Sequence, residues 1–294
     1  MNDYQIFSDS SCDLPASLIE RHQIRLVPFY VTFDQENYYK ENIDITNEAF
    51  YQKLGESGIF PKTSLPSVQD YINLFTPVLK EGRDCLCLCL TQKFSGSFQS
   101  AVNAKLILNE KYPDCRVEVV DTIQATAGQG LTVLQAAYMK EAGYSMDEAI
   151  SRLNEIKFTS RIMFTVDTLE YLAKGGRIGK VTSLAGTMLN LKPMIQLKDA
   201  ELIPYSKVRG RKKALESIIP MLAEYFEQTG ESFDDYDFAM ANATTPDDIR
   251  TIQIRLEELT GRKLSYPIFQ IGVTIGTYTG PGAVGVCCIK KALL

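Results

Sequence analysis

The segment "DCLCLCL" (84–90) constrains the fold of this 294-residue chain more than any other stretch. It is short and almost continuously apolar, as is typical of a strand buried on both faces of a parallel sheet. A glycine-containing turn and an amphipathic helical pattern follow over 91–113, then a second strand at 116–121 and a second helical pattern over 123–143. Strand, helix, strand and helix in this order predict a parallel sheet with right-handed crossovers.

Cys85, Cys87 and Cys89 alternate along the first of these strands and therefore share one of its faces. We interpret them as small, buried core residues. The chain has seven cysteines, and none is arranged in paired C-x-x-C motifs. Neither a disulfide framework nor a zinc site is indicated.

The region before this strand is less regular. A strand and a helix are expected at the start of the chain, followed by two short strands or a hairpin in "RLVPFYVTF" (25–33) and "NYYKE" (37–41). A helix that starts after Thr46 comes next, because Thr46 is a good N-cap residue. The segment "KTSLPS" (62–67) is expected to be a loop.

The pattern changes after residue 158. Two strands there reverse direction at Lys198-Asp199-Ala200, and long helical patterns alternate with further strands up to "VGVCCIKKA" (284–292). A hairpin combined with helices suggests an α+β arrangement. We therefore predict an α/β chain of two domains: an N-terminal α/β domain with a parallel sheet over 1–158, and a C-terminal α+β domain with a mostly antiparallel sheet over 159–294.

Charge and composition exclude several classes of protein. The formal net charge is −5, which argues against nonspecific nucleic-acid binding. The N-terminus carries no basic, apolar leader, and no run of about 18 apolar residues occurs, so neither export nor membrane insertion is supported. The cytoplasm is the expected location.

Gly280, Gly282 and Gly285 spell the pattern G-x-G-x-x-G, which is typical of dinucleotide-binding loops. Such a loop must follow a strand and open a helix that leads to a second strand. Only nine strand-like residues follow Gly285, and no G-x-x-x-x-G-K-[ST] motif is present. We therefore interpret these glycines as a tight turn or a close approach of the backbone to another group.

Three polar segments are candidates for a ligand site. Asp9, Ser10, Ser11 and Asp13 follow the first predicted strand, where α/β sheets bind ligands; the alternative is that Asp13 only caps the next helix. Two further loops offer small hydroxyl side chains near free backbone N–H groups, and the second of them opens a helix. Their residues are Thr63 and Ser64 in "KTSLPS", and Ser95, Gly96 and Ser97 in "KFSGS". Helix capping by Ser95 or Ser97 is the alternative.

No general base accompanies these hydroxyls. His22 is the only histidine, and no G-x-S-x-G elbow occurs. Carboxylates are scattered, so a catalytic metal is poorly supported. The pattern favours binding over catalysis, with no catalytic residue, metal or cofactor expected. The alternative hypothesis is a stand-alone phosphoryl or acyl transferase that uses Asp9, Ser10, Ser11 and Asp121.

Several of these motifs occur together in one known family. "SDSSCDLP", "KTSLPS", "FSGSFQSA", "VVDT", "VDTLEYLAKGGRIG", "LNLKPM" and "IGTYTGPGAVGV" occur here in the order seen in DegV family fatty-acid-binding proteins, which the whole chain resembles. The resemblance implies two domains with a long-chain fatty acid buried between them. It also implies that the protein is a carrier subunit which presents the carboxyl group to a separate fatty acid kinase for acyl-phosphate formation, and that it is not itself an enzyme.

The resemblance also implies site residues. The carboxylate contacts fall on Thr63 or Ser64 and on Ser95 with Gly96, and Arg177 lies near the pocket mouth. The acyl chain needs a lining of apolar residues such as Ile162, Phe164, Met188, Leu189, Met194, Ile195 and Phe269.

One position departs from the family pattern. Family members typically read "GTH" where this chain reads "GTY", so Tyr278 stands where a histidine contacts the head group. A phenol can donate one hydrogen bond to a carboxylate, but it supplies no cation at neutral pH.

The segment "KVRGRKKALE" concentrates positive charge in an otherwise acidic chain. It contains Lys207, Arg209, Arg211, Lys212 and Lys213. We interpret it as an electrostatic dock for an acidic partner, which in this family is the kinase. The alternative is the solvated start of a helix.

Overall fold

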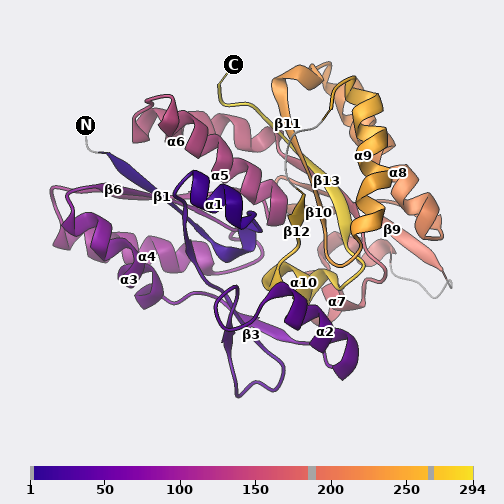
Figure 1. The fold of residues 1–294 in the computed structure, drawn as a ribbon, viewed down its shortest axis with the longest axis horizontal. Helices are drawn as coiled ribbons and strands as arrows, with labels where there is room; N and C mark the ends of the chain where they lie inside the picture. The colour runs from indigo at the N-terminus through magenta and orange to yellow at the C-terminus, as the bar shows by residue number, and fades with distance from the viewer. Residues whose placement is uncertain (1–2, 185–189, 264–267, 294) are drawn as a thin grey trace.

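The computed structural model describes residues 3–184, 190–263 and 268–293. The N-terminal part contains a parallel sheet in the order β2-β1-β6-β7, seen on the left of Figure 1. Its strands are β1 (Tyr4–Asp9), β2 (Arg25–Val27), β6 (Asp84–Cys89) and β7 (Val117–Asp121). The parallel sheet predicted from strand–helix alternation is confirmed.

The two faces of β6 bury different side chains. Cys85, Cys87 and Cys89 are fully buried in the cluster formed with α3 (Val68–Lys80) and α4 (Ser97–Lys111). The leucines between them face the other way, toward α5 (Thr126–Glu141). The interpretation of the cysteines as buried core residues on one face is therefore confirmed.

A mixed, mostly antiparallel sheet occupies the C-terminal part, in the order β10-β9-β8-β13-β11-β12. Its strands are β8 (Arg161–Thr165), β9 (Leu191–Lys198), β10 (Glu201–Arg209), β11 (Tyr236–Asn242), β12 (Phe269–Gln270) and β13 (Val284–Lys290). The predicted reversal between β9 and β10 is confirmed: Asp199 and Ala200 form the two-residue turn, both with positive φ. Helices α8 (Arg211–Thr229) and α9 (Pro246–Thr260) cover one face of this sheet.

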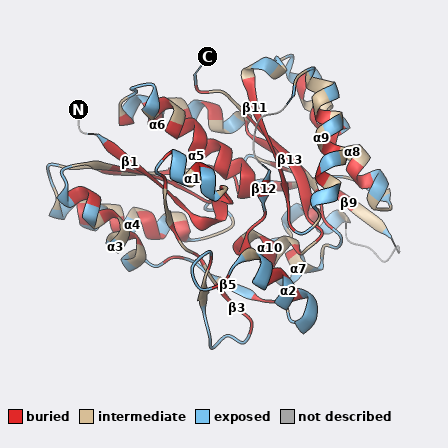
Figure 2. Ribbon diagram, in the orientation of Figure 1, coloured by how far each residue is buried: buried red, intermediate tan, exposed pale blue. Residues whose placement is uncertain are grey.

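Helix α5 lies between the two large sheets and contacts β1 and β6 on one side and β11 and β13 on the other. Figure 2 shows it as an almost continuous red coil, and thirteen of its sixteen residues are buried. Close approach requires a small residue at Gly130, where a Cβ atom would lie 2.6 Å from the Cys12 carbonyl oxygen and 2.6 Å from the Phe269 ring. Helix α5 thus forms a core shared by both sheets.

A small antiparallel sheet, β4-β3-β5, lies at the bottom of Figure 1 next to α2 (Asn47–Ser57). Its strands are β3 (Tyr30–Thr32), β4 (Tyr39–Lys40) and β5 (Lys62–Ser64). The segment predicted as a "KTSLPS" loop therefore begins as a strand, because β3 offers it a pairing edge. The Thr46 cap of α2 is confirmed by a 3.2 Å hydrogen bond from the Ala49 N–H to Thr46 Oγ1.

No helix is predicted from the sequence between β12 and β13, but the structure has α10 (Val273–Thr279) there. Its sequence is rich in β-branched residues and glycine, which disfavour helix formation. Packing overrides this preference: a Cβ atom at Gly276 would lie 2.4 Å from the Tyr51 hydroxyl oxygen, so only glycine lets the helix approach α2.

The other α-helices in the described part of the chain are α1 (Ala16–Arg21), α6 (Met146–Ile156) and α7 (Glu170–Lys174), and four short 3-10 helices accompany them. None of the described helices has both the length and the apolar character needed to cross a bilayer. Every strand of the parallel sheet comes from the first 158 residues and every strand of the six-stranded sheet from the rest. The division into two domains at that residue stays a prediction.

Candidate functional site

A pocket of about 1040 Å³, open mouth included, lies between the six-stranded sheet, α10 and the loops that follow β5 and β6. The sheet supplies most of its inner wall. Leu202, Leu197, Ile162 and Cys287 form one row of register partners across β10, β9, β8 and β13. Each of these side chains is buried and lines the pocket. This part of the wall therefore offers a ligand mainly apolar contacts.

Small residues leave room in the middle of this wall. Ala241 on β11 pairs with Gly285 on β13, and both line the pocket beside Phe164. A larger side chain at Ala241 would project into the pocket, whereas a side chain at Gly285 would first meet Phe164 and the Met163 carbonyl oxygen.

Polar residues gather at the exposed end. Thr63 comes from β5, Ser95 and Gly96 precede α4, Arg177 follows α7, and Tyr278 lies on α10. Gly96 and Arg177 are exposed, whereas the residues of the inner wall are buried. This end is therefore the mouth of the pocket.

The mouth residues contact one another. Thr63 Oγ1 lies 2.6 Å from Tyr278 Oη. The Arg177 guanidinium lies over the Tyr278 ring, 4.8 Å from its centroid, and donates hydrogen bonds to the Phe94 carbonyl oxygen at 3.2 Å. Gly175 permits this stacking, because a Cβ atom there would lie 2.2 Å from the Tyr278 ring. A positive charge and two hydroxyl groups thus converge at the opening, which suits an anionic head group.

Three other threonines line the pocket, but their hydroxyl groups are used elsewhere. Thr126 Oγ1 donates to Asp13, Thr274 Oγ1 donates to Glu41, and Thr279 Oγ1 donates to the Ile275 carbonyl oxygen. The hydroxyl donors that remain for a ligand therefore lie at the mouth.

Five of the predicted site residues line this one pocket: Thr63, Ser95, Gly96, Arg177 and Tyr278. Ser64 does not; it is exposed, because successive residues of β5 point to opposite faces. The Ser95 hydroxyl accepts a 3.1 Å hydrogen bond from the Ser97 N–H, but the N-cap residue of α4 is Gly96, so neither Ser95 nor Ser97 is the cap that the alternative predicted. The ligand contacts of all these residues stay predictions.

Of the apolar residues expected around an acyl chain, Ile162 and Phe164 line the pocket. Met194, Ile195 and Phe269 are buried in the core and are not part of the lining, and Met188 and Leu189 lie outside the described residues. Sequence reasoning missed Leu197, although it shares a strand face with Ile195. It also missed Cys287 and the small residue Ala241, for which the sequence carries no such signal.

The glycines of the G-x-G-x-x-G pattern have separate packing roles. A Cβ atom at Gly280, where φ is +73°, would lie 2.5 Å from the Tyr171 ring. At Gly282 it would lie 2.0 Å from Asp167 Oδ2, and at Gly285 it would lie 2.6 Å from the Met163 carbonyl oxygen. All three contacts are with the protein's own atoms, in agreement with the interpretation as close backbone approach.

The polar residues after β1 form an internal network. Asp9 is fully buried and accepts four hydrogen bonds: from Ser11 Oγ at 2.6 Å, Gln129 Nε2 at 2.8 Å, Ser97 Oγ at 2.9 Å and the Leu90 N–H at 3.0 Å. Burial raises the pKa of Asp9, and these four bonds oppose that rise.

This network does not support a transferase centre. Asp9, Ser10 and Ser11 are buried and do not line the pocket, and Asp121 accepts hydrogen bonds from the Gln92 and Ile123 N–H groups. The alternative role of Asp13 as a helix cap is wrong: Pro15 precedes α1, and Asp13 accepts a hydrogen bond from Thr126 Oγ1 instead.

Comparison with known proteins identifies the family. The family model described as "Uncharacterised protein, DegV family" matches residues 3–291. The chain belongs to the DegV family. A fatty acid-binding protein of Thermotoga maritima is 32% identical over 292 residues, which cover 96% of each chain.

Solved DegV structures share the fold along their whole length. A stearic acid-binding protein from Eubacterium ventriosum has a TM-score of 0.92 at 35% identity, and the match covers 98% of this chain and 99% of that one. A DegV family protein from Thermus thermophilus, described for its fatty acid binding, has a TM-score of 0.87 at 32% identity. The match covers 99% of this chain and 100% of that one. The two-sheet arrangement is therefore the DegV fold.

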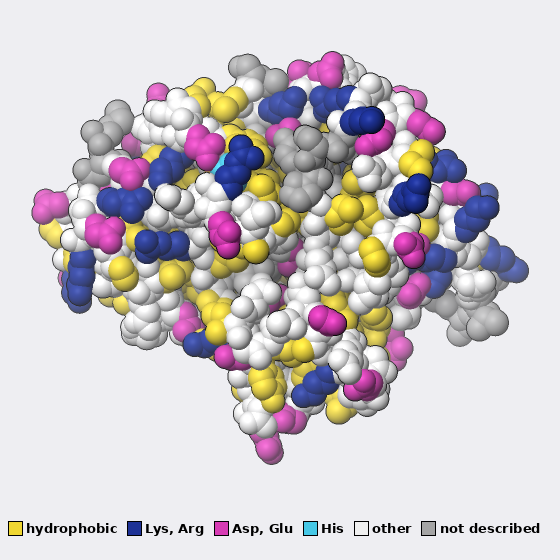
Figure 3. All heavy atoms as spheres, viewed as in Figure 1, with side chains coloured by type: hydrophobic (Ala, Val, Ile, Leu, Met, Phe, Trp, Pro, Cys, Tyr) yellow, Lys and Arg dark blue, Asp and Glu magenta, His cyan; other side chains and the backbone are white. Residues whose placement is uncertain are grey.

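The basic segment of this DegV chain spans two elements. Lys207 and Arg209 are exposed on β10, and Lys212 is exposed in the first turn of α8. Figure 3 shows dark blue side chains along the right-hand edge, where β9, β10 and α8 lie.

Arg211 does not belong to an exposed dock. It forms an ion pair with Asp248 at 2.6 Å and donates to the Gly282 carbonyl oxygen at 2.5 Å. Its guanidinium therefore holds α8 against α9 and the turn before β13. This corrects the prediction for Arg211 and leaves the other four cations, Lys207, Arg209, Lys212 and Lys213, exposed.

Proposed function

We propose that this chain binds one long-chain fatty acid, with the acyl chain along the inner wall of the pocket and the carboxyl group at Thr63, Ser95, Gly96 and Tyr278. One observation carries the proposal: the wall is apolar, while the hydroxyl donors that remain free for a ligand, together with Arg177, lie at the mouth. About 15 buried methylene groups contribute roughly 12 kcal/mol before the costs of association. The relatives named for fatty acid binding support the same ligand class.

We further propose that the bound acid is presented to a partner kinase for acyl-phosphate formation, and that the chain itself is not catalytic. The exposure of Arg177 and Gly96 at the mouth supports the presentation of the acid, since a partner protein can reach a carboxyl group bound there. The sequence contains no P-loop to hold a phosphoryl donor. Lys207, Arg209 and Lys212 offer an acidic partner an exposed basic surface. Seven free cysteines agree with a cytoplasmic location, where thiols stay reduced.

Replacing Thr63 by valine tests the head-group site. The side chain keeps its shape and loses one hydroxyl group, so affinity for oleate should fall about tenfold to a hundredfold, the worth of one hydrogen bond to a charged carboxylate. The matched control is Ser64→Ala, which removes the hydroxyl group of the neighbouring residue on the opposite face. Equal losses in the two variants, measured by isothermal titration, would contradict the assignment of Thr63.

The non-catalytic role has its own test. The purified chain incubated with ATP, Mg²⁺ and oleate is expected to form no acyl-phosphate, because nothing in the described pocket holds a nucleotide. Trapping with hydroxylamine and mass spectrometry measure the product. Turnover by the chain alone would favour the transferase hypothesis instead.

A further inference from the structure

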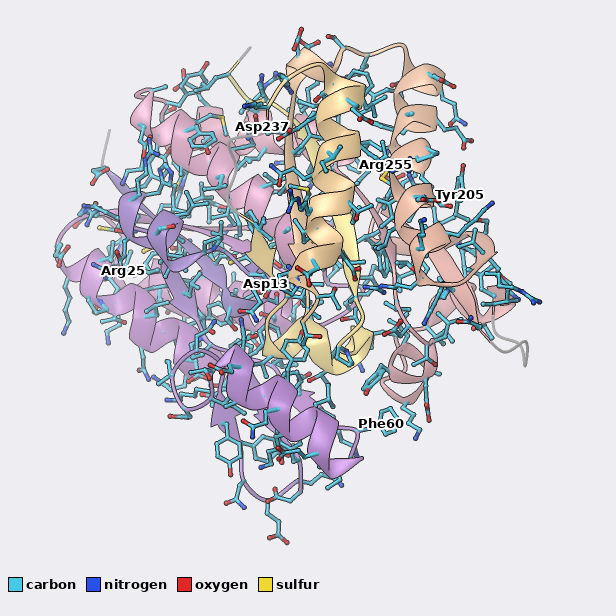
Figure 4. All side chains as sticks on the ribbon, turned by 45° about the vertical axis from the view of Figure 1, so that its right-hand side comes forward. Asp13, Arg25, Phe60, Tyr205, Asp237 and Arg255 are labelled. Carbon is cyan, nitrogen blue, oxygen red and sulfur yellow. The ribbon has the colours of Figure 1, made fainter. Side chains whose placement is uncertain are left out.

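Two buried carboxyl groups, Asp13 and Glu41, meet at the start of α10. Their exposed fractions are 8% and 1%. A Cβ atom built on Gly272 would lie 2.5 Å from Asp13 Oδ1 and 2.6 Å from Glu41 Oε1, so the two oxygens are at most about 5 Å apart. Figure 4 shows Asp13 in the middle of the molecule, between the N-terminal ribbon and the yellow C-terminal segment.

Hydrogen bonding differs between the two groups. Glu41 accepts three bonds: from Ser10 Oγ at 2.5 Å, from Thr274 Oγ1 at 2.7 Å and from the Thr274 N–H at 2.9 Å. Asp13 accepts one side-chain bond, from Thr126 Oγ1 to Oδ2 at 2.6 Å, and the Gly272 N–H also acts to lower its pKa. Its Oδ1 is buried and has no partner at hydrogen-bond geometry. An orphaned carboxylate oxygen is costly, whereas a proton on Oδ1 would make it a donor within about 5 Å of Glu41 Oε1.

The surroundings offer no compensating positive charge. Among the described residues, no lysine, arginine or histidine forms an ion pair with either carboxyl group. The titratable groups that face the pair are Asp9 on β1, Cys12 in the turn after it, Tyr51 on α2 and Cys287 on β13. Each of these is neutral or negative, so none favours a second carboxylate.

Burial is the main cause that raises the pKa of Asp13 well above its usual value, and the charge of Glu41 raises it further. Burial also raises the pKa of Glu41, but the hydrogen bonds from Ser10 and Thr274 lower it. The group with more donors keeps its charge more easily. The hydrogen bonds therefore favour Glu41 as the charged member of the pair and Asp13 as the member that keeps a proton.

The Asp13–Glu41 pair lies against α10, the helix that carries Tyr278. Thr274 and Tyr278 are four residues apart on α10, so they share one side of the helix, and both line the pocket. Glu41 binds the first turn of α10 through Thr274, and Tyr278 in the last turn contacts Thr63 at the mouth. A displacement of α10 at Thr274 would move Tyr278.

We propose that Asp13 stays protonated in the folded protein, shares its proton with Glu41, and with it positions α10 so that Tyr278 lies in the carboxylate site. The link to ligand binding rests on the proposed function; the protonation of Asp13 does not. When the pair loses its proton, two negative charges lie close together beside Gly272, and their repulsion pushes Glu41, and with it the Thr274 turn of α10, out of position. Fatty-acid binding then weakens.

The direction of the pH dependence follows from the number of protons bound in the folded and unfolded states. A carboxyl group whose folded pKa is raised binds more protons in the folded state than in the unfolded state. Its contribution to stability is complete below the unfolded pKa, near the usual 3.8, and is lost as the pH rises through the raised folded pKa. A rise in pH through the raised pKa of Asp13 should therefore weaken both the fold and the position of α10.

Asp13→Asn is the matched variant, because its amide keeps the shape, donates toward Glu41 and has no proton to lose. We expect wild type and variant to bind oleate equally at about pH 6, and the wild type alone to lose about tenfold in affinity for each pH unit above the pKa of Asp13. The titration of oleate itself is common to both proteins and cancels. Identical pH profiles from about pH 6 to about pH 9 would overturn the proposal.

A second measurement needs no ligand. A ¹³C NMR titration of the side-chain carboxyl groups in the ligand-free protein should show Asp13 titrating far above its usual range, and Glu41→Gln should lower that pKa by removing the neighbouring charge. A normal pKa for Asp13, or one that Glu41→Gln leaves unchanged, would overturn the inference. If the wild type binds no fatty acid at any pH, the proposed function fails while this titration still decides the state of the pair.

Discussion

Replacing Ala241 by phenylalanine is expected to reduce fatty-acid affinity about a thousandfold. Ala241 is buried on β11 and lines the middle of the pocket, next to the proposed position of the acyl chain. A benzyl group there fills the space of roughly five methylene groups, and each excluded methylene costs about 0.8 kcal/mol. The sum of about 4 kcal/mol corresponds to about three orders of magnitude in the dissociation constant.

The matched control is Ala16→Phe, which adds the same group to an exposed position in α1, away from the pocket. Overpacking itself costs stability, typically about 1–3 kcal/mol, so thermal unfolding must show that the Ala241 variant is folded at the assay temperature. A folded Ala241→Phe protein that binds oleate as tightly as Ala16→Phe would mean that the acyl chain lies elsewhere.

Replacing Asp9 by alanine is expected to cost about 4 kcal/mol of the free energy of unfolding. The change leaves buried donors on Ser11, Gln129, Ser97 and Leu90 without their acceptor, and each buried, unsatisfied group costs about 1–3 kcal/mol before relaxation. The whole free energy of unfolding of a typical domain is only about 5–15 kcal/mol. Urea unfolding followed by circular dichroism measures the loss.

Asp121→Ala provides the comparison, because Asp121, like Asp9, is the last residue of a strand of the parallel sheet but is only partly buried. It accepts bonds from the Gln92 and Ile123 N–H groups, which water can replace in part. A loss of about 1 kcal/mol is expected for this variant. If Asp9→Ala were no more destabilising than Asp121→Ala, the network after β1 would not be the structural core described above.

The regular parts of the fold could be predicted because local and tertiary preferences agree. The apolar run at β6 and the hairpin that reverses at Asp199 and Ala200 have strong local signals. Helix α10 and strand β5 could not be predicted in the same way. Gly276 is favourable in α10 only because the Tyr51 hydroxyl group lies against it, and β5 is a strand only because β3 pairs with it.

The site shows the same division. The resemblance to DegV proteins brought Thr63, Ser95, Gly96, Arg177 and Tyr278 together, and the structure places all five around one pocket. The resemblance could not decide whether Thr63 or Ser64 lines the pocket, because that depends on which face of β5 points inward. Arg211 was misassigned for a related reason: its partner Asp248 is 37 residues away, and only the packing of α8 on α9 brings them together.

The most direct test of the central claim is the lipid content of the protein as purified from a heterologous host. Denaturing extraction and mass spectrometry of wild type and Ala241→Phe, prepared side by side, should recover close to one long-chain acyl group per wild-type chain and almost none from the variant. Absence of any acyl chain from the wild type, together with no binding of added oleate or palmitate, would contradict the assignment of this pocket to a fatty acid.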